Sequence, residues 1–116
     1  MTRNRCIGQW GEQAAADYLC TRGYQISGRN VRTPYGEIDI VATKDGQTVF
    51  VEVKARTNSR YGPPEVAVTA RKRAHMLACA DHYAQQNSLD HWQIDVIAVA
   101  RLNQQIEIKH FENAIS

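Results

Sequence analysis

Two stretches of the chain carry small and apolar residues at helical spacing. In residues 8–21 the inward positions recur at i, i+3, i+4 and i+7, so they share one face of a helix, and Glu12 is the first of them. Residues 67–86 repeat the pattern with alanines and Leu77. We therefore predict two helices, the first of which ends near Gly23, a residue suited to the left-handed turn after a helix.

Five other stretches have the composition of strands. Residues 35–43 and 47–56 are rich in Ile, Val and Phe, and the Asp45-Gly46 pair between them is a strong signal for a two-residue hairpin turn. Residues 92–102 contain a nearly unbroken apolar run, which is typical of a central strand covered on both faces. The remaining elements are predicted strands over 24–32 and 106–111 and a loop over 57–64.

The order α-β-β-β-α-β-β predicts one α/β domain over residues 1–116, in which helices flank a mixed central sheet. The length of 116 residues fits one domain of ordinary size. The three cysteines are odd in number and lack ligand spacing, which argues against disulfides and structural zinc and favours a reducing compartment. We also expect no signal peptide and no membrane span, since no apolar run approaches about 20 residues. A cytoplasmic protein is the expectation.

The net charge of +2 hides an uneven distribution of charge. Residues 1–73 hold 12 of the 14 Lys and Arg residues but 7 of the 12 Asp and Glu residues, which gives this segment +5 and leaves −3 for the rest. A basic segment of this kind suggests a polyanionic partner such as nucleic acid.

The predicted hairpin sets acidic residues opposite each other. Counting back from its turn, Asp39 faces Glu52, and Glu37 faces Lys54. Because directly opposed residues project to the same side of a sheet, these side chains share one face, and Ile38 and Ile40 point to the other face. Two opposed carboxylates lie about 4.5–5.5 Å apart at Cβ, and like charges about 4 Å apart repel by roughly 4 kcal/mol near a protein surface.

A raised pKa, a neighbouring cation such as Lys54, or a bound metal ion would relieve this repulsion. Ligands that are all oxygen favour Mg²⁺ or Mn²⁺ over zinc. The alternative is a solvated strand face with a ladder of ion pairs. The apolar residues that surround these charges on both strands favour a functional site.

The same residues carry a resemblance to a known class of proteins. Asp39 followed by Glu52-Val53-Lys54 resembles the D…(D/E)-x-K core of the restriction-endonuclease-like, or PD-(D/E)xK, nuclease superfamily. The whole chain resembles the YraN-like family of small bacterial proteins, which is related within that superfamily to Holliday-junction resolvases. The matching stretches are Gly11-Glu12, residues 36–41 and residues 49–56. Ile38 stands where the superfamily name has Pro.

The resemblance implies a three-layer restriction-endonuclease-like fold and a role for each matching residue. Asp39, Glu52 and the backbone carbonyl of Val53 would hold one or two Mg²⁺ or Mn²⁺ ions. Lys54 would position or deprotonate the attacking water, or stabilise the phosphate in the transition state. Glu12 would approach the site from the first helix as a further catalytic residue that helps to bind or orient the metal-bound water. From the hairpin register, Glu37 is expected to pair with Lys54 or to support the site rather than to bind the metal itself.

Five basic residues are candidate contacts to nucleic acid. They lie at the end of the third strand, in the following loop and at the start of the second helix. Cations at the start of a helix are disfavoured by the helix dipole, and a bound phosphate would offset this unfavourable interaction. Simple solvation is the alternative for each of them. The candidates are Arg56, Arg60, Arg71, Lys72 and Arg73.

Asp95 is the one acidic residue inside the apolar run of residues 92–102. A structural acid held by hydrogen bonds is the more economical interpretation, and a catalytic role is the alternative. The four histidines lack metal-ligand spacing and are predicted to be surface or structural residues.

These features predict a metal-dependent endonuclease that hydrolyses phosphodiester bonds in DNA rather than RNA, with branched or structured DNA as the expected substrate. By analogy with resolvases we expect a homodimer. Two alternatives stay open. One is a nucleic-acid-binding module that retains the fold without catalysis, and the other is a structural partner protein.

Overall fold

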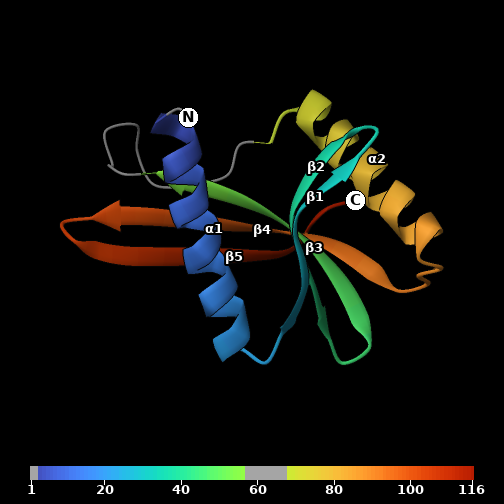
Figure 1. Ribbon diagram of the computed structural model, residues 1–116, viewed down its shortest axis with the longest axis horizontal. Helices are drawn as coiled ribbons and strands as arrows, with labels where there is room; N and C mark the ends of the chain where they lie inside the picture. Colours follow the sequence, from blue (N-terminus) through green and yellow to red (C-terminus); the bar gives the residue numbers. More distant parts are fainter. Residues whose placement is uncertain (1–2, 57–67) are drawn as a thin grey trace.

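Five strands form one mixed sheet in the computed structural model, which describes the backbone of residues 3–56 and 68–116 and the side chains from Trp10 onward in these ranges (Figure 1). The strand order is β1-β2-β3-β4-β5. The elements are α1 (Arg3–Thr21), β1 (Gln25–Thr33), β2 (Gly36–Lys44), β3 (Gln47–Arg56), α2 (Ala70–Gln86), β4 (Trp92–Leu102) and β5 (Gln105–Ile115).

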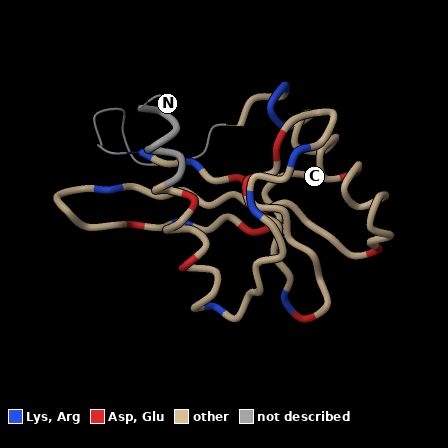
Figure 2. The backbone as a smooth tube through the Cα atoms, viewed as in Figure 1, with Lys and Arg blue, Asp and Glu red and all other residues tan. Residues whose placement is uncertain are grey.

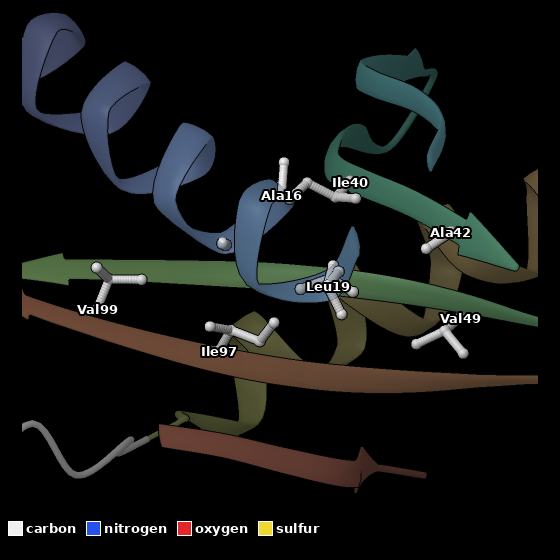
Figure 3. Close-up of a cluster of buried hydrophobic side chains, with 9 residues drawn as sticks. Ala16, Leu19, Ile40, Ala42, Val49, Ile97 and Val99 are labelled. Carbon is white, nitrogen blue, oxygen red and sulfur yellow. The ribbon is translucent and has the colours of Figure 1, made fainter. Parts of the chain in front are cut away.

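The two helices pack on opposite faces of the sheet. β3 and β4 are parallel because α2 connects them, whereas all other neighbouring strands are antiparallel. Ile97 and Val99 of β4 pack in a cluster with α1, shown in Figure 3, while Ile94 and Val96 of the same strand pack in a second cluster with α2. This alternation confirms that β4 is a central strand with both faces covered.

The predicted two-residue turn between β2 and β3 is confirmed. Asp45 and Gly46 both have positive φ, 53° and 78°, as a type I′ turn requires. The turn closes on Lys44 and Gln47, and the two strands stay in the predicted register from there.

β2 parts from β3 beyond the pair Ile40 and Val51, where their described pairing ends. The predicted ladder pairs of Asp39 with Glu52 and of Glu37 with Lys54 are therefore wrong. The reason is that the Asp39 side chain, through Oδ2, accepts the hydrogen bond of the Val53 backbone N–H at 2.8 Å and so takes the place of a main-chain carbonyl.

The separation of the strands also moves Ile38. Its side chain packs with the α2 cluster, whereas Ile40 packs with the α1 cluster. The prediction that both residues point to one face is thus wrong for Ile38. The side chains of β2 therefore switch from one face of the sheet to the other at Asp39, between these two residues.

Several element bounds differ from the predicted ones. α2 begins at Ala70 because the Thr69 side chain caps it by accepting the Lys72 N–H at 3.1 Å. β5 continues to Ile115, past a register shift, because the Asn113 N–H donates to the buried Asp95 carboxylate at 2.9 Å. α1 begins earlier than predicted, at Arg3. The predicted loop over 57–64 and the residue Ala67 lie outside the described residues.

Close approach of α1 to β3 depends on Gly11. A Cβ atom at this position would lie 2.5 Å from the Cβ atom of Ala55. The substitution Gly11→Ala is therefore expected to lower the free energy of unfolding by about 1–3 kcal/mol through overpacking. Urea denaturation measures this change. The added substitution Ala55→Gly should recover part of the loss, and an unchanged unfolding midpoint in Gly11→Ala would contradict the packing that the structure shows.

No helix in the described part of the chain combines the length and apolar character needed to cross a membrane. Two helices and five strands account for most of the described residues, and their arrangement confirms the predicted α/β class with a mixed sheet.

Candidate functional site

Asp39 lies in the gap where β2 leaves β3. Its carboxylate is largely buried and accepts the Val53 N–H. Burial raises the pKa of Asp39 to about 7, and the negative charge of Glu52 adds to this rise, while the hydrogen bond from Val53 opposes it. The carboxylates of Asp39 and Glu52 are therefore close enough to repel each other, although their residues are not ladder partners.

Glu52 is held between two lysines. Its Oε2 atom lies 3.8 Å from Nζ of Lys54 on the same strand face and 3.4 Å from Nζ of Lys72 at the start of α2. The Glu52 side chain is only 11% exposed, whereas the two lysines are 38% and 42% exposed. Both cations can thus neutralise Glu52 and still reach a ligand in solvent.

Lys72 was predicted as a nucleic-acid contact and not as a neighbour of the acidic site. The sequence places it on the first turn of a helix that follows a long connection, and only the crossover of α2 beside β3 brings it to Glu52. Its charge also lowers the pKa of Asp39, though less than the other groups raise it.

Glu12 approaches the same gap from α1, as its place on the inward face of the helix predicted. Its Oε1 atom is buried and has no hydrogen-bond partner among the described residues. Burial raises the pKa of Glu12, and the charges of Glu37 and Glu52 raise it further. A hydrogen bond from the Asn30 side chain opposes this rise.

Asn30 is a residue of the site that the sequence did not indicate. It has a φ of 51°, a left-handed conformation that asparagine adopts more readily than most residues, and it interrupts the pairing of β1 with β2 opposite Asp39. The sequence does offer one signal for this irregularity, since Gly28 and Asn30 are residue types that are uncommon inside regular strands.

Glu37 does not pair with Lys54 as predicted. Its Oε2 atom lies 3.6 Å from Nε of Arg32, its partner on β1, and both side chains are well exposed. An exposed ion pair of this kind contributes little to stability. Glu37 still acts on the site at longer range, because its charge raises the pKa of Glu12.

The basic residues predicted to contact nucleic acid surround the acidic gap only in part. Arg71 and Arg73 are exposed on the first turns of α2, and Arg56 is half-buried at the end of β3. Arg60 lies outside the described residues. In the view of Figure 2, acidic positions of different elements project onto the middle of the molecule, with basic positions beside them.

The donor atoms of the gap suit a hard divalent cation. Within residues 10–56 and 68–116, no three side chains of the His, Cys, Asp and Glu types form a ready metal-binding group. The available donors are instead the two carboxylates of Asp39 and Glu52, backbone oxygen, and the unpartnered Oε1 atom of Glu12. All are oxygen atoms, and a cation would remove the repulsion that raises the pKa of Asp39.

Asp95 is a structural acid, as predicted, and lies in a hydrogen-bonded network apart from this gap. It is fully buried and accepts hydrogen bonds from Nε2 of Gln93 at 2.8 Å and from the Asn113 N–H at 2.9 Å. Its second oxygen lies 2.7 Å from Nε2 of His110, whose Nδ1 atom lies 3.1 Å from the hydroxyl of Tyr18.

The substitution Asp95→Ala is expected to lower the free energy of unfolding by about 3 kcal/mol, because it removes the fully buried acceptor shared by Gln93, His110 and the Asn113 N–H. Thermal and urea denaturation measure the change. The matched substitution Asp90→Ala removes an exposed carboxylate and should be nearly neutral. A loss for Asp95→Ala no larger than that of the control would show that the network does not stabilise the fold.

The fold and the gap define an α/β protein in which largely buried carboxylates lie beside two partly exposed lysines. The family model described as "Uncharacterised protein family UPF0102" matches residues 11–99. The chain therefore belongs to the UPF0102 family, which is the YraN-like family that the sequence resembles.

Bacterial members of the family cover nearly the whole chain. A UPF0102 protein of Syntrophotalea carbinolica is 44% identical over 110 residues, which are 93% of this chain and 89% of that one. A UPF0102 protein of Geobacter metallireducens is 45% identical over 114 residues, with 96% and 93% covered. A UPF0102 protein of Syntrophomonas wolfei is 42% identical over 113 residues, with 96% and 98% covered.

A solved structure with a distant likeness is that of Pyrococcus furiosus SfsA in complex with Ca²⁺. It is 14% identical, with a TM-score of 0.44, and the match covers 97% of this chain. The chain spans 65% of the length of SfsA. A likeness of this degree does not establish a shared fold.

Proposed function

We propose that this protein is a metal-dependent endonuclease of the restriction-endonuclease-like class, which hydrolyses phosphodiester bonds in DNA. The observation that carries the proposal is the gap between β2 and β3. There the carboxylates of Asp39 and Glu52 lie together with Lys54, and the buried Oε1 atom of Glu12 has no partner among the described residues.

Asp39 and Glu52 would hold Mg²⁺ or Mn²⁺, together with the carbonyl of Val53. In an extended strand the N–H and C=O of one residue point to the same side, and the Val53 N–H is already directed at Asp39. When bound, the ion would lower the pKa of a water molecule and neutralise negative charge on the phosphate. Because the pKa of Asp39 is raised to about 7, a proton and a cation would compete for this carboxyl group near neutral pH.

The remaining side chains have separate tasks in this proposal. Lys54, on the same strand face as Glu52, would orient the attacking water or stabilise the phosphate oxygens by its charge. Glu12 would accept a hydrogen bond from that water through its unpartnered Oε1 atom. Lys72 would fix the carboxylate of Glu52 and compensate its charge.

DNA would be bound through its phosphates and its shape. The sequence has no base-reading motif, and the exposed Arg71 and Arg73 at the start of α2, with Arg56 and Arg60 near the end of β3, are suited to phosphate contacts. The resemblance to Holliday-junction resolvases favours branched DNA as the substrate, in the cytoplasm. No observation favours RNA.

Two alternatives make different predictions. A binding module that does not cleave has no use for a pair of buried, mutually repelling carboxylates, which lower stability. A structural partner protein would need neither these carboxylates nor a cation at Lys54. The repulsion at Asp39 therefore favours the enzyme over both alternatives.

A panel of nucleic acids tests the proposal. The purified protein is incubated with four-way junction, flap, single-stranded and linear duplex DNA and with RNA, in the presence of Mg²⁺, Mn²⁺ or EDTA. We expect metal-dependent cleavage of branched DNA and its loss in Glu52→Gln. Binding without cleavage would support the binding module, and neither binding nor cleavage of any substrate would support the structural role.

A further inference from the structure

The two edges of the sheet differ in regularity. At the β1 edge the register shifts between Ile26 and Gly28, and Asn30 has a positive φ, irregularities that commonly protect an edge from pairing with another chain. β5, in contrast, keeps an unbroken register with β4 from Gln105 to Phe111. It is the last strand of the described sheet, and the tip of the β4–β5 hairpin projects beyond α1 (Figure 1).

The backbone groups on the outer side of β5 follow from the hairpin turn. Asn103 and Gln104 have φ values of 51° and 68°, which is the pattern of a two-residue type I′ turn that closes on Leu102 and Gln105. The two residues of that closing pair exchange both of their main-chain hydrogen bonds. Because N–H and C=O groups alternate in direction along a strand, those of every second residue of β5 then point toward β4. The N–H and C=O groups that point outward belong to Ile106, Ile108 and His110.

The side chains of β5 favour pairing with an identical strand. Two antiparallel copies are related by a two-fold axis, and an axis at Ile108 sets Glu107 of each copy opposite Lys109 of the other. An axis at Glu107 would oppose two carboxylates, and an axis at Lys109 would oppose two ammonium groups. Of these three positions of the axis, Ile108 is thus the one that forms two ion pairs and opposes no like charges.

The same register also satisfies the outward backbone groups. Ile108 pairs with Ile108 of the second copy and Ile106 with His110 of that copy, which are the residues whose N–H and C=O groups point outward. Glu107 and Lys109 then form the closer pairs without main-chain hydrogen bonds, in which side chains interact most strongly. Ile106, at 48% exposed one of the large apolar residues most open to solvent in the described chain, would be covered.

We propose that the outer edge of β5 is an interaction surface for a second copy of this chain, which pairs in antiparallel register about Ile108 and joins two five-stranded sheets into one. The strand contributes one short row of residues, so the interface is small and the dimer forms in a concentration-dependent way. The inference depends on the geometry of the edge and is independent of the proposed nuclease activity.

Charge reversal tests the register. Sedimentation velocity over a micromolar to high-micromolar range should show the native chain passing from monomer to dimer. Glu107→Lys and Lys109→Glu should each remain monomeric, because each brings like charges together. An equimolar mixture of these two variants should form a heterodimer, and the double variant should dimerise like the native chain. Glu112→Lys, a reversal beyond the regular part of β5, is the control and should still dimerise.

Hydrogen exchange gives a second, independent readout. The amides of Ile106, Ile108 and His110 should become protected only as the protein concentration rises, whereas those of Glu107 and Lys109 should be protected throughout. A native chain that stays monomeric over the whole range, or a Glu107→Lys variant that dimerises as the native chain does, would overturn the proposal.

Discussion

Replacing Lys54 by alanine is expected to reduce DNA cleavage by about 10²- to 10³-fold, because a preorganised charge at the reacting phosphate contributes to the transition state on this scale. Affinity for DNA should change little, since a single phosphate contact among several is removed. Lys54 lies 3.8 Å from Glu52, and its side chain is 38% exposed, so it is placed to meet both the acidic site and a substrate.

The measurement is the single-turnover cleavage rate, with binding measured separately in EDTA. Lys44→Ala serves as the matched control, because Lys44 lies at the β2–β3 turn with its ammonium group over the Tyr24 ring and away from the candidate site. The control should cleave at the native rate. Cleavage by Lys54→Ala at the native rate would show that Lys54 has no part in the reaction.

The metal-free protein should lose stability as the pH rises from about 4 to about 7. The folded state holds a proton on Asp39, whose pKa is raised from 3.8 to about 7, in a range where the unfolded chain has released it. The folded state thus binds more protons across this window, and stability falls with rising pH until Asp39 is ionised in both states. The total loss is on the order of 2–4 kcal/mol.

Asp39→Asn should remove this pH dependence and make the metal-free protein more stable than the native protein at about pH 8. The asparagine side chain has no charge to repel Glu52, and its carbonyl oxygen can still accept the Val53 N–H. Urea denaturation in EDTA across the pH range measures both effects. A variant less stable than the native protein at the higher pH would show that repulsion does not act at this site.

Divalent ions should reverse the loss for the native protein. Mg²⁺ or Mn²⁺ that binds only the folded state raises the melting temperature by an amount that grows with the logarithm of its concentration above Kd, and the rise should be largest above the pKa of Asp39. Asp39→Asn should show little or no rise. Asp45→Asn, which removes an exposed carboxylate at the hairpin turn, should behave like the native protein.

Much of the sheet could be predicted from the sequence because its signals are local. The Asp45-Gly46 turn sets both its own geometry and the register of the strands that it joins, and the bounds of β3 and β4 agree with the prediction. The apolar run around Asp95 likewise indicated a strand covered on both faces. In these segments turn chemistry and the alternation of side chains decide the structure without help from distant residues.

The candidate site could be predicted only in part, because its geometry depends on a side chain and on tertiary packing. Asp39 bonds to the backbone of Val53 and so ends the ladder that the turn had begun. No periodic pattern in the sequence indicates that a side-chain carboxylate will replace a main-chain carbonyl as the hydrogen-bond acceptor. Lys72 reaches Glu52 through the crossover of α2. Asn30 reaches Glu12 through an irregular edge strand.

Glu12 shows the opposite case, in which a pattern predicted a tertiary position. The residue begins the inward face of α1, and Gly11 beside it allows the helix to lie against β3. Burial of the Glu12 carboxylate follows from these two features together. The resemblance to the D…(D/E)-x-K core added the roles of the residues, which remain part of the proposal.

The most direct test of the proposed activity is the cleavage of one four-way junction by the native protein, Asp39→Asn and Lys54→Ala, purified in parallel and assayed with Mg²⁺, Mn²⁺ or EDTA. The account predicts cleavage by the native protein only when a divalent ion is present, and at most residual cleavage by either variant. Equal cleavage by all three proteins, or cleavage by the native protein in EDTA, would contradict it.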